Sequence, residues 1–535
     1  MIKIRQGPRY YFAAVLSALL LFIASPGQWF FAPIMWIALV PLIRVCLSNN
    51  ISISTAAGLG FFSGLLYNTA LLYWVVIALG RYGGLPLPVA ILALLGLAVY
   101  MALYVAGFAA TLSATRNLLP VVISAPIIWV GLDQIRAWLF TGFPWLDLGY
   151  SQFKTPFLIQ VADLTGHSGI TFLIVMINAL AASFLCRETS LFTTRKNFIF
   201  RRSSRLLAIL LVSSAIIYGT IRIEQLNSLL AKAPTVTTAV MQGNIDQGEK
   251  WSATGTEKAV ETYLNLTRQA VARQAIDLAI WPETALPFFP ADSPLLDKIQ
   301  DFASLPSSPQ ILTGAPSYSM TAVDPTEYFN SAFLITDKQH KTMQRYDKQH
   351  LVPFGEYVPL QKLLGTLPIA HTMGNFSPGR SPAALEGKTA KLGVLICFES
   401  IFSSLAKSRT DSGADILINL TNDAWYGISS APYQQLSMVV LRAVENRRSL
   451  ARAANTGISC FIDPLGRIIE ASPIFKQLFL VQNLPIMNSQ SVFDRFGYTF
   501  QPICLILLSL IVLYGIVAGN RSTRHQHISS QKIRL

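Results

Sequence analysis

The stretch at residues 392–399 reads LGVLICFE and places a thiol and a carboxylate at the end of an apolar run. Five apolar or small residues lead to Cys397, and Glu399 follows two positions later. A short apolar run of this kind predicts a buried β-strand in an α/β sheet. Because ligands gather at the carboxyl ends of such strands, we expect a reactive thiol at a sheet edge. The alternative is a buried core cysteine, which is the commoner role for an isolated thiol in this setting.

Other polar groups follow strand-like runs in the same way. The run LAIWP leads to Glu283, and the run ILINLTN leads to Asp423. The segment YDKQHLVPFGE at 346–356, which Pro and Gly interrupt, supplies Lys348 and Glu356. Taken singly, Glu283 could be an acid at a helix N-terminus and Lys348 part of a solvated charge run. Together with a thiol, a base and a cation are the groups that covalent acyl transfer requires.

The segment 231–485 around these residues alternates short β-rich runs with helix-like stretches, which is typical of one α/β layered domain. The strand-like runs include 235–241, 278–281, 310–312, 332–336, 392–397, 416–420 and 459–462, and the helix-like stretches include 257–274 and 433–446. The segment carries 22 basic and 22 acidic residues, so the net charge of +14 lies outside it. This neutral domain gives no support to nucleic-acid binding. The five cysteines of the chain show no CxxC spacing, so neither a metal site nor a disulfide framework is predicted.

Apolar runs near the membrane-spanning length flank this domain, in a chain that is 52% hydrophobic and only 13% charged. Seven precede it and one follows it: 10–24, 29–47, 56–79, 87–112, 118–132, 168–186, 206–219 and 502–518. The first run resembles a signal peptide, but the further runs favour an uncleaved first helix. We therefore expect a membrane domain of seven helices at 1–230, and an eighth helix with a basic tail at 486–535.

The excess of basic residues predicts how the chain is oriented. Lysines and arginines gather in the amino-terminal tail, in the loop after the sixth run and in the carboxyl tail. With eight spans, all three regions lie on one side of the membrane, which the distribution of positive charge identifies as the cytoplasm. The domain at 231–485 then lies on the outer face. The spans are poor in ionisable residues, which argues against a transporter with an accessory domain.

Glu283, Lys348 and Cys397 resemble, in order and context, the Glu-Lys-Cys triad of the nitrilase (carbon-nitrogen hydrolase) superfamily. Over nearly the whole chain, the sequence is similar to the apolipoprotein N-acyltransferase family of bacterial inner-membrane enzymes. The similar stretches are TGFPW at 141–145, GYSQ at 149–152, MQGNI at 241–245 leading to Trp251, WPE at 281–283, HLVPFGE at 350–356 and NDAW at 422–425. No single stretch is specific, but their ordered set is.

The resemblance implies an αββα sandwich inserted between spans seven and eight. It also implies that Glu283 is the general base, that Lys348 stabilises the oxyanion, and that Cys397 is the nucleophile that becomes a thioester. The acyl donor would be a phospholipid and the acceptor a diacylated apolipoprotein, at the periplasmic face of the inner membrane and without a metal or cofactor. The runner-up function is a membrane-tethered amidase or nitrilase, for which a single span would suffice.

The resemblance gives further residues a place near this site. Glu356 and Glu399 match positions that support the triad. Trp251 matches an aromatic near the substrate entry, and Trp425 is a second candidate contact, although both are rim or packing aromatics first. Phe398 is a departure, because many relatives have Tyr after the nucleophile.

Overall fold

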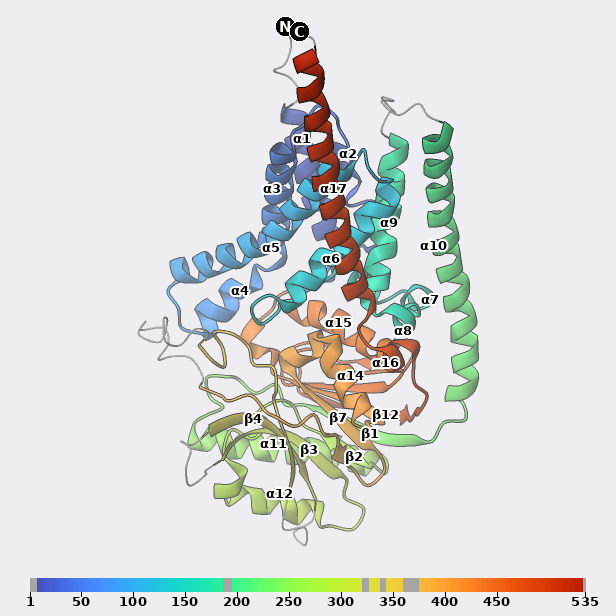
Figure 1. Cartoon of the computed structure of the whole chain (residues 1–535). Helices are drawn as coiled ribbons and strands as arrows, with labels where there is room; N and C mark the ends of the chain where they lie inside the picture. The colour runs from blue at the N-terminus through green and yellow to red at the C-terminus, as the bar shows by residue number, and fades with distance from the viewer. Residues whose placement is uncertain (1–6, 186–194, 320–326, 337–342, 359–374, 533–535) are drawn as a thin grey trace.

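The computed structural model describes residues 7–185, 195–319, 327–336, 343–358 and 375–532. Helices form a bundle at one end of the molecule, and two stacked β-sheets lie at the other (Figure 1). Helix α1 begins, α9 ends, α10 begins and α17 ends at the end of the bundle farthest from the sheets (Figure 1).

The bundle contains six helices that are long and apolar enough to cross a membrane, among the described residues. They are α1 (Gly7–Ala24), α5 (Leu87–Thr115), α6 (Val121–Trp138), α9 (His167–Leu185), α10 (Arg195–Leu230) and α17 (Phe500–Lys532). A seventh candidate is a pair bent by 50°, α3 (Ile53–Leu71) with α4 (Trp74–Val76) and η2 (Ile77–Tyr82). Short helices complete this part: η1 (Ala32–Trp36), α2 (Val40–Cys46), η3 (Leu148–Gln152), α7 (Pro156–Ile159), α8 (Ala162–Thr165) and α16 (Val492–Phe496).

The second and third predicted spans are less regular than the sequence suggested. The run at 29–47 forms two short helices, η1 and α2, each with a proline in its first turn. Pro33 and Pro41 favour the start of a new helix because proline has no N–H to donate. The run at 56–79 is helical but breaks between Leu71 and Trp74. Among the described residues, the structure therefore has six regular candidate spans and a bent seventh, and it does not confirm eight.

In the part of the chain that the structure describes, each sheet contains six strands. The first sheet has the order β12-β1-β2-β3-β4-β5 and the second the order β11-β10-β9-β8-β7-β6. The strands of the first sheet are β1 (Thr235–Gln242), β2 (Leu278–Ile280), β3 (Gln310–Ser319), β4 (Glu327–Ile335), β5 (Gln344–Asp347) and β12 (Leu478–Pro485). Those of the second are β6 (Leu385–Glu386), β7 (Lys391–Ile396), β8 (Ile416–Thr421), β9 (Ser449–Ala454), β10 (Cys460–Ile462) and β11 (Ile468–Ala471).

These sheets stack face to face with helices on both outer sides. Along β1, Val236 and Val240 join the core between the sheets, whereas Ala239 and Met241 join the core under α11 (Ala253–Arg273) and α12 (Leu295–Ala303). This alternation is the period of two that buries both faces of a strand. On the far side, α14 (Ser403–Asp411) and α15 (Ala431–Asn446) cover the second sheet (Figure 1). The layers are therefore α-β-β-α, as the family resemblance implied.

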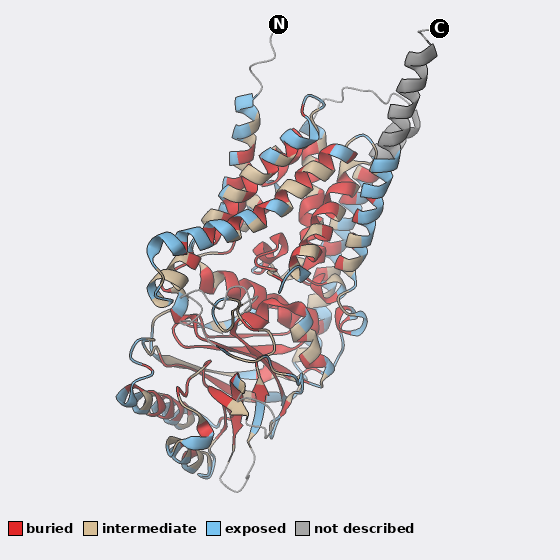
Figure 2. Ribbon diagram, turned by 60° about the vertical axis from the view of Figure 1, so that its left-hand side comes forward, coloured by how far each residue is buried: buried red, intermediate tan, exposed pale blue. Residues whose placement is uncertain are grey.

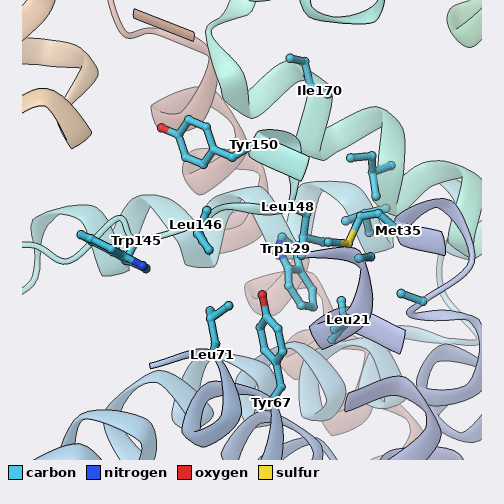
Figure 3. Packing of buried hydrophobic residues seen from close by; sticks show 14 of the residues in the cluster. Leu21, Met35, Tyr67, Leu71, Trp129, Trp145, Leu146, Leu148, Tyr150 and Ile170 are labelled. Carbon is cyan, nitrogen blue, oxygen red and sulfur yellow. The ribbon is translucent and has the colours of Figure 1, made fainter. Parts of the chain in front are cut away.

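Helix α15 joins the second sheet to the bundle. The largest apolar core of the molecule runs from residues of the bundle, such as Trp145 and Leu148 (Figure 3), into α15 and the second sheet. Buried residues are concentrated where the bundle meets the sheets, and exposed ones on the outer helix faces (Figure 2). The helices and the sheets therefore share one interior.

Buried charges cross the same junction. His167 on α9 contacts Asp147 through Nε2 at 2.8 Å and Glu445 of α15 through Nδ1 at 3.1 Å, and Arg442 pairs with Glu445 at 3.0 Å. Farther along, Arg447 pairs with Asp163 of α8 at 2.6 Å. Removing one partner of such a buried set leaves an uncompensated charge, which typically costs about 3–5 kcal/mol.

Candidate active site

Cys397 follows strand β7 directly, at the sharp turn into the 3-10 helix η6 (Cys397–Ile401). Its backbone has a φ of +51°, in the left-handed region that non-glycine residues rarely occupy. Such a conformation costs on the order of 1–3 kcal/mol and is found mainly where function requires it. The Gln435 side chain of α15 donates to the Cys397 carbonyl at 3.1 Å and so helps to hold the turn.

Glu283 lies just after strand β2 of the other sheet and is almost fully buried. Its Oε1 accepts a hydrogen bond from Asn330 Nδ2 at 2.8 Å, and its Oε2 accepts one from the backbone N–H of Asn422 at 2.9 Å. Gly314 of β3 lies beneath this turn, where a Cβ would come within 2.4 Å of the Thr284 nitrogen. A larger residue at 314 would therefore displace the carboxylate.

Lys348 follows strand β5 and points its ammonium at two carboxylates. Nζ lies 2.8 Å from Glu356 Oε2 and 3.7 Å from Glu283 Oε1, and the side chain is buried. Burial alone would lower the pKa of Lys348, but the negative charges of Glu356 and Glu283 raise it above its ordinary value. The raised pKa favours the protonated ammonium at neutral pH. Asn330 also donates to Glu356 at 2.8 Å, so one amide orients both acids.

The charges of Glu283 and Lys348 also influence the Cys397 thiol. Burial and the negative charge of Glu283 raise the pKa of Cys397 to about 12, against the opposing influence of Lys348. At pH 7 only ~1 thiol in 10⁵ is then ionised, and the thiolate is the nucleophilic form. A reactive Cys397 therefore needs a base that removes its proton during the attack. Glu283 is a carboxylate whose field the thiol senses directly.

His350 lies close enough to Lys348 to be affected by its charge. Burial and the positive charge of Lys348 lower its pKa to about 4, so the ring is neutral at pH 7. It packs 4.0 Å from Phe402, ring centroid to ring centroid.

Glu399 is fully buried two positions after Cys397 and links the two sheets. Its Oε2 accepts from the Ile396 N–H at 2.7 Å, at the end of β7. Its Oε1 accepts from the Tyr346 hydroxyl and the Gln349 N–H, both at 2.7 Å, on either side of Lys348. The resemblance implies that Glu399 supports the triad. Its hydrogen bonds join the turn at Cys397 to the backbone around Lys348.

Aromatic rings connect Phe398, which follows Cys397, to the bundle. Phe398 stacks on Phe143 at 6.3 Å, and Phe143 stacks on Trp145 at 5.7 Å. The Phe398 ring also meets Phe402 edge-on at 5.2 Å. Trp425, on η7 (Asp423–Tyr426), is 39% exposed and meets Tyr82 of η2 edge-on at 6.4 Å. It therefore lies at the junction with the bundle, as a rim residue would.

The loop between β1 and α11 carries Trp251, which is 54% exposed and distinct from the buried triad. Its neighbour Lys250 is unexpectedly buried. The Lys250 side chain is fully buried, and its Nζ has no hydrogen-bond partner among the described residues. Burial lowers its pKa to about 8, against the attraction of Glu283. Nothing in the sequence predicts the burial of Lys250, because a lysine beside a tryptophan carries no signal of burial.

Comparisons with known proteins bear on both halves of the chain. Residues 17–180 match the Apolipoprotein N-acyltransferase N-terminal domain, and residues 237–482 match the Carbon-nitrogen hydrolase domain. The chain is 38% identical to the Apolipoprotein N-acyltransferase of Geobacter metallireducens, over 97% of each chain. It is 32% identical to that of Pasteurella multocida, over 96% of each chain, and 29% identical to that of Chlorobaculum tepidum, over 95% of this chain and 96% of that one.

Proposed function

Because this chain belongs to the apolipoprotein N-acyltransferase family, and is an acyltransferase, we propose that it moves a fatty acyl chain from a phospholipid to an apolipoprotein through Cys397. The acceptor is the α-amino group of a diacylglyceryl-cysteine. One observation carries the assignment of the site. Glu283, Lys348 and Cys397 reach one buried centre from separate loops, and the aromatic rings beside Cys397 continue into the bundle.

In the first half-reaction, Cys397 Sγ attacks the ester carbonyl carbon of the phospholipid while Glu283 accepts the thiol proton. The negative charge that develops on the carbonyl oxygen is stabilised by the Lys348 ammonium. The ester C–O bond then breaks, and Glu283 returns the proton to the departing oxygen. The products are a Cys397 thioester and a lysophospholipid.

In the second half-reaction, the neutral amine of the acceptor attacks the thioester carbonyl. Glu283 accepts a proton from the nitrogen, the C–S bond breaks, and the proton passes to Sγ. An amide and the free thiol result. The same base and cation serve both halves, so the kinetics are ping-pong, and the phospholipid loads the enzyme before any apolipoprotein is present.

The membrane arrangement is part of the proposal. We assign eight passes, counting the bent α3–α4 pair and the short η1–α2 pair, with 1–230 as the membrane domain, 231–485 as the catalytic domain and 486–535 as the last pass and tail. The helix ends nearest the basic regions lie together, away from the sheets (Figure 1). Positive charge favours the cytoplasm. The sheets would then be periplasmic, at the inner membrane of a bacterium.

The decisive experiment is mass spectrometry of the full chain after incubation with phosphatidylethanolamine vesicles alone. We expect an acyl-sized adduct on Cys397, matched by released lysophospholipid. The Cys397→Ser variant should show neither, because an alcohol is far less acidic than a thiol. Cys460, which is buried elsewhere, is a matched control as Cys460→Ser. An adduct on Cys460, or normal transfer by Cys397→Ser, would exclude this mechanism. Hydrolysis of a soluble amide without lipid would favour the amidase alternative.

A further inference from the structure

The three reacting groups follow strands of two different sheets. Glu283 follows β2 and Lys348 follows β5, both in the first sheet, whereas Cys397 follows β7 in the second. The sheets meet through an apolar core, and apolar attraction is not directional. Catalysis nevertheless needs the thiol and the cation within about 0.5 Å of their productive positions. A directional link between β5 and β7 is therefore required.

Arg409 of α14 supplies such a link, and its side chain is fully buried. Its Nε donates to the Val394 carbonyl of β7 at 2.9 Å. Its Nη2 donates to the Gln349 side chain at 2.7 Å and to the Tyr346 hydroxyl, which belong to β5 and the loop after it. The guanidinium carbon also lies 4.5 Å from the centroid of the Tyr346 ring. One guanidinium thus bonds to both sheets.

Tyr346 passes this link on to the nucleophile turn. Its hydroxyl accepts from Arg409 and donates to Glu399 Oε1 at 2.7 Å. Lys348 lies two residues farther along the chain, and the next N–H, that of Gln349, also binds Glu399. The backbone on both sides of Lys348 is therefore fastened to the turn that presents Cys397.

We propose that Arg409 and Tyr346 are positioning residues for acyl transfer, which with Glu399 fix the Lys348 ammonium relative to the Cys397 thiol. This assignment rests on the proposed role of Cys397 and extends it. Neither residue touches the reacting atoms. Their contribution is to the geometry and to the charge state of Glu399.

The charges around Glu399 make the proposal testable by pH. Burial raises the pKa of Glu399, and Arg409 is the main influence that opposes this rise, followed by the Ile396 N–H, Tyr346 and Lys348. A protonated Glu399 can no longer accept all of its hydrogen bonds, so the link weakens as the pH falls through its pKa. Removing the Arg409 charge should move this loss of activity to a higher pH.

The test compares Arg409→Met, Arg409→Lys and Tyr346→Phe in the full chain, by the rate of lysophospholipid release as a function of pH. We expect Arg409→Met to slow acylation roughly 10- to 100-fold, with the apparent KM for phospholipid little changed, and to shift its acidic limb to higher pH. Arg409→Lys keeps the charge and should restore the position of the limb. Lys407→Met is the matched control on the same helix, because Lys407 pairs only with Asp411 among the described residues.

A normal rate and an unmoved acidic limb in folded Arg409→Met would overturn the proposal. A rate loss with an unmoved limb would do so too, since it would show a merely structural effect. If Arg409→Met does not fold, Tyr346→Phe decides, because it removes only one hydroxyl: unchanged acylation by this variant overturns the proposal. In each case Cys397 would still form the thioester, so failure here is distinguishable from failure of the proposed function.

Discussion

Replacing Lys250 by methionine should stabilise the protein at neutral pH. The ammonium is fully buried without a hydrogen-bond partner among the described residues, and burial lowers its pKa from 10.5 to about 8. A tenfold change in proton affinity corresponds to about 1.4 kcal/mol, so the cost of burying the charge is ~3 kcal/mol. Methionine keeps the length and apolar stem of the side chain without the charge.

The stabilisation by Lys250→Met should depend on pH. Below pH 8 the lysine is charged in both the folded and the unfolded chain, so the folded state bears the full cost. Between about pH 8 and 10.5 the folded state loses the proton while the unfolded chain keeps it, and the cost disappears. The advantage of Lys250→Met should therefore be largest below pH 8 and shrink towards pH 10.5.

The assay is thermal unfolding of the detergent-solubilised full chain between pH 6 and 10. Lys258→Met is the control, because the Lys258 side chain is 77% exposed on α11 and its loss should change stability by less than about 0.5 kcal/mol. A variant that is less stable than the parent at pH 7, or a gain that does not diminish at high pH, would refute the reasoning. A stabilised variant with reduced acyl transfer would show why the lysine is retained, since functional sites commonly sacrifice stability.

Three further predictions concern the site and the membrane. Glu283→Gln keeps the shape of the side chain but cannot take the thiol proton, so acyl-enzyme formation should fall roughly 100-fold or more; near-normal formation would exclude the base. Lys348→Met should impair both half-reactions, whereas an acyl-enzyme that forms normally but does not transfer would assign the lysine to the acceptor. In a background without native cysteines, a thiol reagent added from the outer face should label a cysteine at the exposed Ser381 and not one at the exposed Arg202; the reverse pattern would place the catalytic domain in the cytoplasm.

Ser381 lies in a loop that also contains a tightly packed position. The Pro/Gly-rich stretch at 377–382 is a surface loop, as its composition predicts. Gly379 within it is nevertheless a tight contact, where a Cβ would lie 2.1 Å from the Asp347 carbonyl oxygen. A probe at Gly379 would press on the strand that leads to Lys348. Composition identifies the loop, but only the packing shows which of its positions are free.

The sequence predicts well what depends on neighbours in the chain. The strand before Cys397 and the helix at 433–446 follow from local apolar patterns, and both are present as β7 and α15. The break in the third span does not follow from such a pattern, because its residues are apolar on both sides of the bend. The roles of the triad came from resemblance, since a lone carboxylate or thiol has no distinctive local signal.

Contacts between distant segments could not be predicted. Tyr346 and Glu399 are 53 residues apart, and Arg409 and Tyr346 are 63 apart, so nothing local marks them as partners. Lys250 has the same difficulty, since its burial arises from the docking of its loop. Asn455, which follows β9 of the other sheet, accepts through its side chain from the Ile245 N–H of that loop at 3.0 Å.

The buried charges on α15 bear on how this protein can change over time. Arg442 and Glu445 of α15, and Arg447 directly after it, have partners on segments of the bundle, so the half that contains the sheets is not an independent module with a membrane anchor. Without the bundle, it would expose charges and apolar surface that the described bundle residues cover. A different membrane anchor would not restore it. We therefore expect the two halves to be inherited together. Substitutions at Glu445 or Arg447 should be accompanied by substitutions around His167 and Asp163, which contact them.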